Sequence, residues 1–125
     1  MIQSFRDLTV WHKGIDLVVR VYSFTQSFPR SELYGLTSQM QRASVSIPSN
    51  IAEGKAIGGR GYLRHLRIAL GSEAELQTHI EIATRLKLIA PNEAEKLLNE
   101  TSQVGKMLTS LLRSLRPLRA NDPTA

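Results

Sequence analysis

The chain has 125 residues and a formal net charge of +5, with a sequence pI of about 10.0. It contains no cysteine, which excludes a disulfide framework, a thiolate nucleophile and a cysteine-based metal site. No apolar run approaches the roughly 20 residues that a membrane helix needs, and residues 1–10 lack the apolar segment of a signal peptide. We therefore expect one cytoplasmic domain over residues 1–119, followed by a disordered tail at 120–125.

The first predicted helix covers about residues 5–27. One apolar stripe with helical spacing comprises Leu8, Trp11, Ile15, Val18 and Tyr22. A second stripe beside it comprises Val10, Leu17, Val21, Phe24 and Phe28. Together they form a wider apolar face than a monomeric bundle of this size needs. Because surplus apolar surface favours self-association, we expect a homo-oligomer.

The second predicted helix covers about residues 37–56 and contains the run Arg42–Gly54. Its apolar residues that recur every four positions are Ala43, Ile47 and Ile51. Pro48 interrupts this pattern at a cost of roughly 3 kcal/mol in a helix interior, so surrounding structure must hold the segment in place. Small polar residues nearby, among them Asn50, are available to satisfy the backbone that Pro48 disrupts.

Residues 58–61 read Gly-Gly-Arg-Gly and predict a flexible, tight linker before a third helix at about residues 61–87. Glu73 falls on the apolar stripe of that helix, and a buried carboxylate needs a partner. Either Arg42 or Asn50 of the second helix supplies that partner, or Glu73 faces a subunit boundary.

Glu75 and His79 also lie on the third helix. Their spacing of four residues does not match the Glu-x-x-His pattern of di-iron bundles. We interpret them as a helix-surface pair. The sequence contains no hydrolase triad, P-loop or dinucleotide fingerprint, and no cofactor is expected.

The fourth predicted helix covers about residues 91–116. It begins at Pro91, where the missing N–H costs nothing, and continues with a regular apolar heptad. Four helices joined by short loops predict an all-α, antiparallel up-down-up-down four-helix bundle.

The predicted topology brings three basic segments to one end of the bundle: residues 1–13, 53–67 and 106–119. They carry net charges of +1, +3 and +4, which leaves −3 on the rest of the chain. Cations at the end of the fourth helix complement its dipole. Arg60, Arg64 and Arg67 instead share one face at the start of the third helix, where cations oppose the dipole. A phosphate-bearing partner explains this trio better than stability does.

These observations predict a non-enzymatic protein that binds the backbone of RNA or DNA through its basic end. The expected nucleic-acid-binding residues are Lys55, Arg60, Arg64, Arg67, Lys106, Arg113 and Arg116. The residues expected to be structural, or to lie at an interface, are Arg42, Pro48, Asn50 and Glu73. The alternative function is a protein-interaction scaffold, whose basic end serves solubility or an acidic partner.

Several motifs of the chain resemble a known family. They are Asp16–Val19, Phe28–Pro29, Tyr34–Gln39, Arg42–Gly54, Ala69–Ser72 and Glu75–Leu76. They are similar to the bacterial four-helix-bundle proteins encoded by intervening sequences of 23S rRNA genes. The resemblance extends from about Phe5 to Leu115, and the run Ser46–Gly54 is its most specific part.

That family is also similar to the accessory variability determinant of diversity-generating retroelements, a basic homopentamer that binds nucleic acid and a reverse transcriptase. The resemblance thus implies a four-helix bundle, a pentamer, a nucleic-acid partner and a possible protein partner such as a reverse transcriptase. No catalytic residues carry over. The chain departs from the family pattern at Gly59–Leu63 and at Lys87–Leu88, and neither departure threatens the fold.

Overall fold

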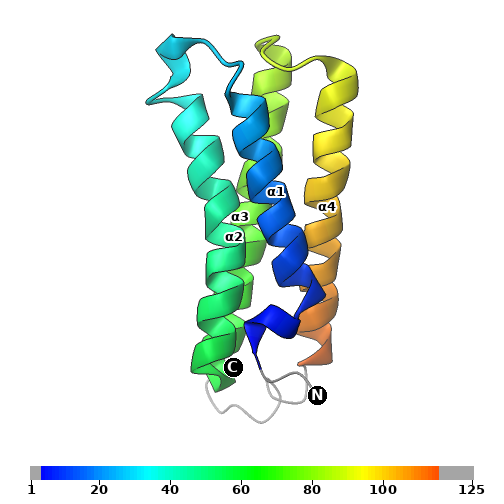
Figure 1. The fold of residues 1–125 in the computed structure, drawn as a ribbon. Coiled ribbons are helices and arrows are strands. Elements are labelled where there is room, and N and C mark those ends of the chain that lie inside the picture. Colours follow the sequence, from blue (N-terminus) through cyan, green and yellow to red (C-terminus); the bar gives the residue numbers. More distant parts are fainter. Residues whose placement is uncertain (1–3, 116–125) are drawn as a thin grey trace.

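A computed structural model describes residues 4–115, in which every regular element is helical. The four long helices are α1 Thr9–Thr25, α2 Leu36–Ile57, α3 Gly59–Arg85 and α4 Pro91–Ser114. They run antiparallel in one bundle (Figure 1), so the predicted all-α four-helix architecture is confirmed. Within residues 4–115, no helix is both long and apolar enough to cross a membrane.

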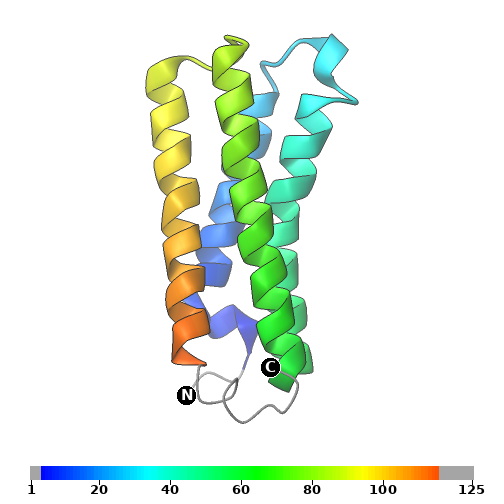
Figure 2. The same ribbon diagram turned by 180° about the vertical axis from the view of Figure 1, so that it is seen from behind.

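The four helices form a square in which sequence neighbours are also spatial neighbours. α2 packs along α3 and against α1, and α3 also packs against α4. The start of α1, the α2–α3 connection and the end of α4 lie at the same end of the bundle (Figures 1 and 2). This arrangement brings the basic segments together as the topology predicted.

The core is a continuous apolar cluster to which all four helices contribute. Its largest fully buried side chains include Leu17, Met40, Ile47, Ile51, Leu66, Leu76, Ile80, Leu97 and Leu108. Removing one such side chain from water contributes roughly 1.5–3 kcal/mol. Thr101 is a buried polar residue of this core, and its hydroxyl donates to the Leu97 carbonyl at 2.7 Å.

The second predicted stripe of α1 faces the core along its length, whereas the first reaches it only near its start, where Leu8 is buried and Trp11 packs against the core. The buried positions along α1 are Val10, Gly14, Leu17, Val21 and Thr25. Ile15 and Tyr22, predicted on the first stripe, remain 39% and 43% exposed. From Ile15 onward, that stripe forms a flank of the bundle, because the neighbouring helices cover the side of α1 that carries Leu17.

The predicted first helix is interrupted near its start. Residues Phe5–Asp7 form a 3₁₀ turn that is closed by a capping box. The Ser4 hydroxyl accepts from the Arg6 N–H, and the Asp7 carboxylate accepts from the Ser4 N–H. Leu8 is then extended and buried, and α1 begins only at Thr9.

The glycine-rich linker is shorter than the sequence predicted. Only Gly58 separates α2 from α3, and Arg60 and Gly61 are already helical. Gly58 and Gly59 have φ angles of 78° and 56°, in the left-handed region that favours glycine. Two such residues reverse the chain at once, so the linker is tight as predicted, but it comprises one residue rather than residues 58–61.

Pro48 lies inside α2 without ending the helix. It is buried against α1 at Gly14, where a Cβ atom would come 3.3 Å from the Pro48 Cβ atom. Packing against α1 at Gly14, which has no side chain, holds the segment of α2 around Pro48 in place. The Asn50 amide donates to the Ser46 carbonyl at 2.8 Å, not to the carbonyl of Ser44 that Pro48 leaves without its helical donor.

Candidate functional site

Basic side chains gather at the end of the bundle where α1 and α3 begin. The cations there, within residues 4–115, are Arg6, Lys13, Lys55, Arg60, Arg64, Arg67, Lys106 and Arg113. The acids of the same region are Asp7 and Glu53. The fold therefore brings the predicted binding residues into one region of the surface. Arg116, also predicted there, lies outside the described residues.

Arg64 and Arg67 are the least compensated of these cations. Both side chains are exposed on the first half of α3. Neither forms an ion pair or a hydrogen bond with another residue of the described range. The two like charges lie three residues apart on one helix and repel each other, so stabilisation of α3 does not account for them.

Two other cations of this end lie over aromatic rings. The Lys55 ammonium is 5.5 Å from the centroid of the Tyr62 ring, and burial raises the pKa of the Tyr62 phenol. The Arg6 guanidinium is 5.3 Å from the Phe5 ring and 5.6 Å from the Trp11 ring. Such contacts orient the two cations and leave their charge in place.

A ladder of polar side chains joins α2 to α3. The hydroxyls of Ser46 and Ser72 are 2.8 Å apart, and the Asn50 amide donates to the Ser46 hydroxyl at 3.0 Å. The Asn50 carbonyl oxygen accepts from Nδ1 of His65 at 2.8 Å. The ladder thus runs from the middle of the bundle toward the basic end, and it gives Asn50 a structural role.

Glu73 is buried inside a single chain, between α3 and α4, with only 4% of its surface exposed. Gln77, one turn along α3, donates from Nε2 to the carboxylate Oε2. Burial raises the pKa of the Glu73 carboxyl, and the hydrogen bond from Gln77 opposes that shift.

The predicted pairing of Glu73 with α2 is wrong. Arg42 is exposed, and no hydrogen bond or ion pair joins it to Glu73 within the described range. Asn50 is engaged with Ser46 and His65. The physical reason is the rotation of α3: Ser72 faces α2, and the next residue, about 100° further around the helix, faces α4.

Gly105 of α4 is a packing position that sequence reasoning missed. A Cβ atom there would lie 2.7 Å from both Cδ and Oε1 of Glu73. The bare backbone makes room for the carboxyl group at the floor of a groove between α3 and α4. A glycine beside the apolar heptad of α4 was the available signal, because such a glycine costs about 1 kcal/mol of helix propensity.

The interpretation of Glu75 and His79 as a helix-surface pair holds for only one of them. The two side chains approach to 3.8 Å, and Glu75 is exposed, but His79 is 4% exposed. Nδ1 of His79 has no hydrogen-bond partner, and burial lowers the pKa of its imidazole against the attraction of Glu75. No group of three or more metal-ligating side chains occurs among residues 4–115.

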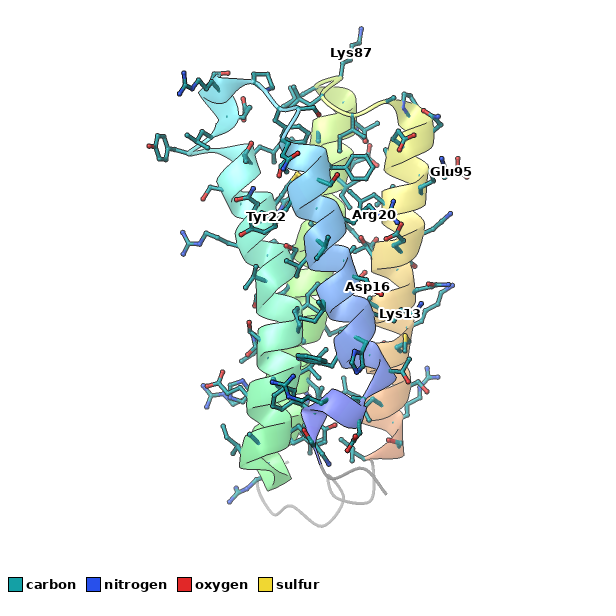
Figure 3. All side chains as sticks on the ribbon, viewed as in Figure 1. Lys13, Asp16, Arg20, Tyr22, Lys87 and Glu95 are labelled. Atoms are coloured by element: carbon teal, nitrogen blue, oxygen red, sulfur yellow. The ribbon has the colours of Figure 1, made fainter. Side chains whose placement is uncertain are left out.

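The outer face of α1 carries charged and apolar strips. Lys13, Asp16 and Arg20 lie on the edge next to α4 (Figure 3), where Arg20 pairs with Glu100 at 3.3 Å. An apolar strip lies beside them and comprises the exposed Ile15, Val19 and Tyr22 together with the half-buried Val18. The surplus apolar surface predicted at Val10, Val21 and Phe24 is instead buried in the core or packed against it. The exposed strip consists of members of the other predicted stripe together with Val19, which was on neither stripe.

Residues 6–110 match the family described as 23S rRNA-intervening sequence protein. The chain belongs to this family. The match spans α1, α2 and α3 completely and most of α4, so it confirms the resemblance drawn from the Ser46–Gly54 run.

The fold of this 23S rRNA-intervening sequence family member is similar to that of a solved structure. It is a crystal structure at 1.70 Å from Bacteroides thetaiotaomicron, described as a protein with unknown function from the S23 ribosomal protein family. The two share 23% identity over 83% of this chain and 95% of that chain, with a TM-score of 0.77. At that identity the likeness shows the fold. No curated protein matches the chain.

Proposed function

We propose that this protein is a non-enzymatic, homo-oligomeric bundle that binds the phosphate backbone of RNA or DNA through its basic end. The observation that carries the proposal is the exposure of Arg64 and Arg67 without partners among the described residues. Their charges lie three residues apart on α3 and repel each other, and phosphates relieve this repulsion. Lys106 and Arg113, exposed on α4, extend the surface that a strand would follow.

Fluorescence anisotropy with labelled single-stranded RNA and DNA tests this function. Binding should tighten as salt is lowered, because each neutralised phosphate releases counterions. The logarithm of the binding constant falls linearly with the logarithm of the salt concentration. In the double variant Arg64→Gln/Arg67→Gln the slope of this line should be shallower by the amount that about two phosphate contacts contribute. Arg42→Gln/Lys87→Gln removes the same charge from exposed positions outside the basic end and serves as the matched control.

Two results would overturn backbone binding. One is an absence of binding at low salt, and the other is an equal loss of affinity in both double variants. The second would show that net charge alone sets the affinity, without any contribution from where the arginines lie.

Self-association is proposed from the apolar strip on α1, in which Ile15, Val19 and Tyr22 are exposed. The likeness of the family to the pentameric accessory determinant supports five subunits. Light scattering of the purified protein measures that number, and a monomer across the accessible concentration range would exclude it.

A second candidate function is a scaffold or accessory subunit that recruits another protein, such as a reverse transcriptase. The same exposed strip on α1 favours it, because apolar surface beside charged groups suits a protein partner. A partner that remains bound after nuclease treatment and high salt would support the scaffold. A partner released by nuclease would support the nucleic-acid function.

A further inference from the structure

Two exposed apolar surfaces lie on opposite sides of the bundle. Within residues 4–115, α1 and α3 each pack against α2 and α4 but not against each other, so they stand diagonally across the square. α1 lies in front in Figure 1, and α3 lies in front in Figure 2, which shows the bundle from behind. The apolar strip on α1 and the outer face of α3 therefore point in opposite directions.

The outer face of α3 has small residues at its centre. Gly71, Ala74 and Thr78 are exposed there, and a Cβ atom at Gly71 would meet nothing within 4 Å. Ile68 and Ile82, which are 40% and 42% exposed, lie toward the two ends of this face. The helical spacing of these five residues places them on one side of α3. The face is thus apolar at both ends and flat between them.

The two surfaces lie at the same height along the bundle. Gly14 of α1 lies against Pro48 of α2, and the hydroxyls of Ser46 of α2 and Ser72 of α3 are 2.8 Å apart. Because α2 and α3 are antiparallel, Pro48 is level with the position about two residues before Ser72. The apolar strip, which begins one residue after Gly14, is therefore level with about residues 71–78 of α3.

The two surfaces complement each other in side-chain size and in charge. The bulky side chains of the strip would face the small residues at the centre of the α3 face. The edge of the strip carries Lys13, Asp16 and Arg20, whose formal net charge is +1. The exposed charged residue among residues 71–78 is Glu75, which is negative.

A contact between these two different surfaces covers both of them. If the strip instead packed against the strip of a second copy by two-fold symmetry, Ile68 and Ile82 would remain in water. Pairing α1 with α3 is therefore the contact that removes more of the exposed apolar surface.

We propose that the apolar strip on α1 packs against the outer face of α3 in a second copy of this chain. The inference rests on self-association, which is part of the proposed function, and it specifies the two surfaces that meet. Each subunit then has one surface of each kind. Such a head-to-tail contact repeats from copy to copy until the assembly closes into a ring.

The directions of the helices determine where the basic ends lie in such a ring. α1 and α3 both begin at the basic end (Figure 1), so the two helices are parallel when copies related by rotation meet side by side. All basic ends then lie on one rim. Arg64 and Arg67 lie closer to the basic end than residues 71–78, so they stay outside the contact and beside the start of α1 in the neighbouring copy. A bound strand could consequently contact two subunits.

Chemical cross-linking tests the pairing, because the chain has no cysteine of its own. The double variant Val19→Cys/Ala74→Cys places one cysteine on each surface, and a short bismaleimide is added to the purified protein. The two cysteines of one chain lie on opposite sides of the bundle, so a link must join two copies. We expect a ladder of linked subunits on a denaturing gel, with a highest rung that gives the size of the ring.

The matched control is Val19→Cys/Leu86→Cys, in which the second cysteine is exposed at the end of the bundle opposite the basic end. The double variant with Ala74→Cys should give a linked yield at least about tenfold above this control, because the interface raises the effective concentration of the two thiols. Tyr22→Cys/Thr78→Cys, a second level pair, should also give the ladder. Light scattering before the reagent is added shows whether each variant assembles as the parent does.

The single variants distinguish the proposed contact from a two-fold contact. Val19→Cys alone and Ala74→Cys alone should give no linked dimer, because each interface then holds one cysteine. Linked dimers from Val19→Cys alone would overturn the pairing and leave self-association intact. Oligomers that give no ladder with either pair of cysteines would also overturn it, and a ladder without a highest rung would overturn the ring. A monomeric parent would overturn both the inference and the self-association on which it rests.

Discussion

Gly54 of α2 lies directly against His65 of α3. A Cβ atom at position 54 would come 2.7 Å from the His65 Cβ atom and 3.3 Å from Cδ1 of Tyr62. The His65 Cβ atom is fixed to the α3 backbone and cannot rotate away. The close approach of the two helices near the basic end therefore depends on a glycine at position 54, and it also keeps Asn50 within 2.8 Å of His65.

Replacing Gly54 with alanine should destabilise the bundle. The added methyl group must push α3 away, at a cost of about 1–3 kcal/mol in the free energy of unfolding measured with urea. Gly71→Ala is the control, because a Cβ atom there meets nothing within 4 Å. That control should gain about 0.5–1 kcal/mol from helix propensity. Equal effects of the two substitutions would contradict the packing argument.

Glu73→Gln should make the protein more stable at neutral pH. Burial raises the pKa of the Glu73 carboxyl above its ordinary value of 4.5, so the folded chain holds the proton more tightly than the unfolded chain. Stability is consequently lost as pH rises from 4.5 through the folded pKa. Gln keeps an acceptor for Gln77 and removes the charge, so the variant escapes this loss.

Urea unfolding at about pH 4 and about pH 7 measures the effect. The parent and the Glu73→Gln variant should have similar stability at the lower pH, and the variant should be more stable at the higher pH. Glu75→Gln should stay within about 0.5 kcal/mol of the parent at both values. A variant that is less stable at neutral pH would show that the carboxylate is stabilised rather than penalised by its surroundings.

His79→Leu should remove an acid sensitivity of the fold. Burial lowers the pKa of His79 below its ordinary 6.5, so the unfolded chain gains a proton before the folded chain does. Stability is then lost as pH falls from 6.5 through the folded pKa. Leucine has no titrating group, so the variant does not lose stability in this way. Leucine also removes the buried Nδ1 that has no hydrogen-bond partner, which should raise the free energy of unfolding by about 1 kcal/mol even at neutral pH.

The measurement for His79 is the free energy of unfolding at about pH 7.5 and about pH 5.5. The His79→Leu variant should lose less stability between the two values than the parent. His12→Gln is the control, since His12 is exposed at the basic end. If the His79→Leu and parent curves run parallel, another group carries the acid sensitivity.

Val19→Glu should disrupt self-association. Val19 is 65% exposed in the apolar strip of α1, and burying a valine at a subunit contact contributes roughly 1.5–3 kcal/mol. A charge at that position should weaken association by at least about tenfold, seen as smaller particles in light scattering. Leu86→Glu is the matched control, because Leu86 is 58% exposed after α3, away from the strip. An unchanged particle size in Val19→Glu would place the interface elsewhere.

Much of the fold could be predicted from local patterns. The four helices, their order and the shared end of the basic segments follow from apolar periodicity and short connections, which need no knowledge of neighbours. The specific run Ser46–Gly54 also indicated the family that the match over residues 6–110 confirms. The predicted helix boundaries were wrong by a few residues where a capping box or a left-handed backbone conformation sets the boundary, as at Ser4 and at the two glycines after α2.

The partners of individual side chains could not be predicted in the same way. Periodicity placed Glu73 on an apolar stripe, but the stripe of a helix is wide and touches two neighbours. A rotation of α3 about its own axis by the angle between successive residues decides which neighbour a side chain contacts. Glu73 therefore contacts Gly105 of α4 rather than Arg42 of α2. The same ambiguity left open which stripe of α1 enters the core.

The sequence by itself determined the helices, the bundle topology and the concentration of charge at one end, because each depends on residue type and spacing along the chain. Only the tertiary structure decided how each helix is turned toward its neighbours. That rotation is set by the packing of all four helices together, through contacts such as Gly14 with Pro48 and Gly54 with His65. It buries His79 and Glu73 and leaves Arg64 and Arg67 exposed.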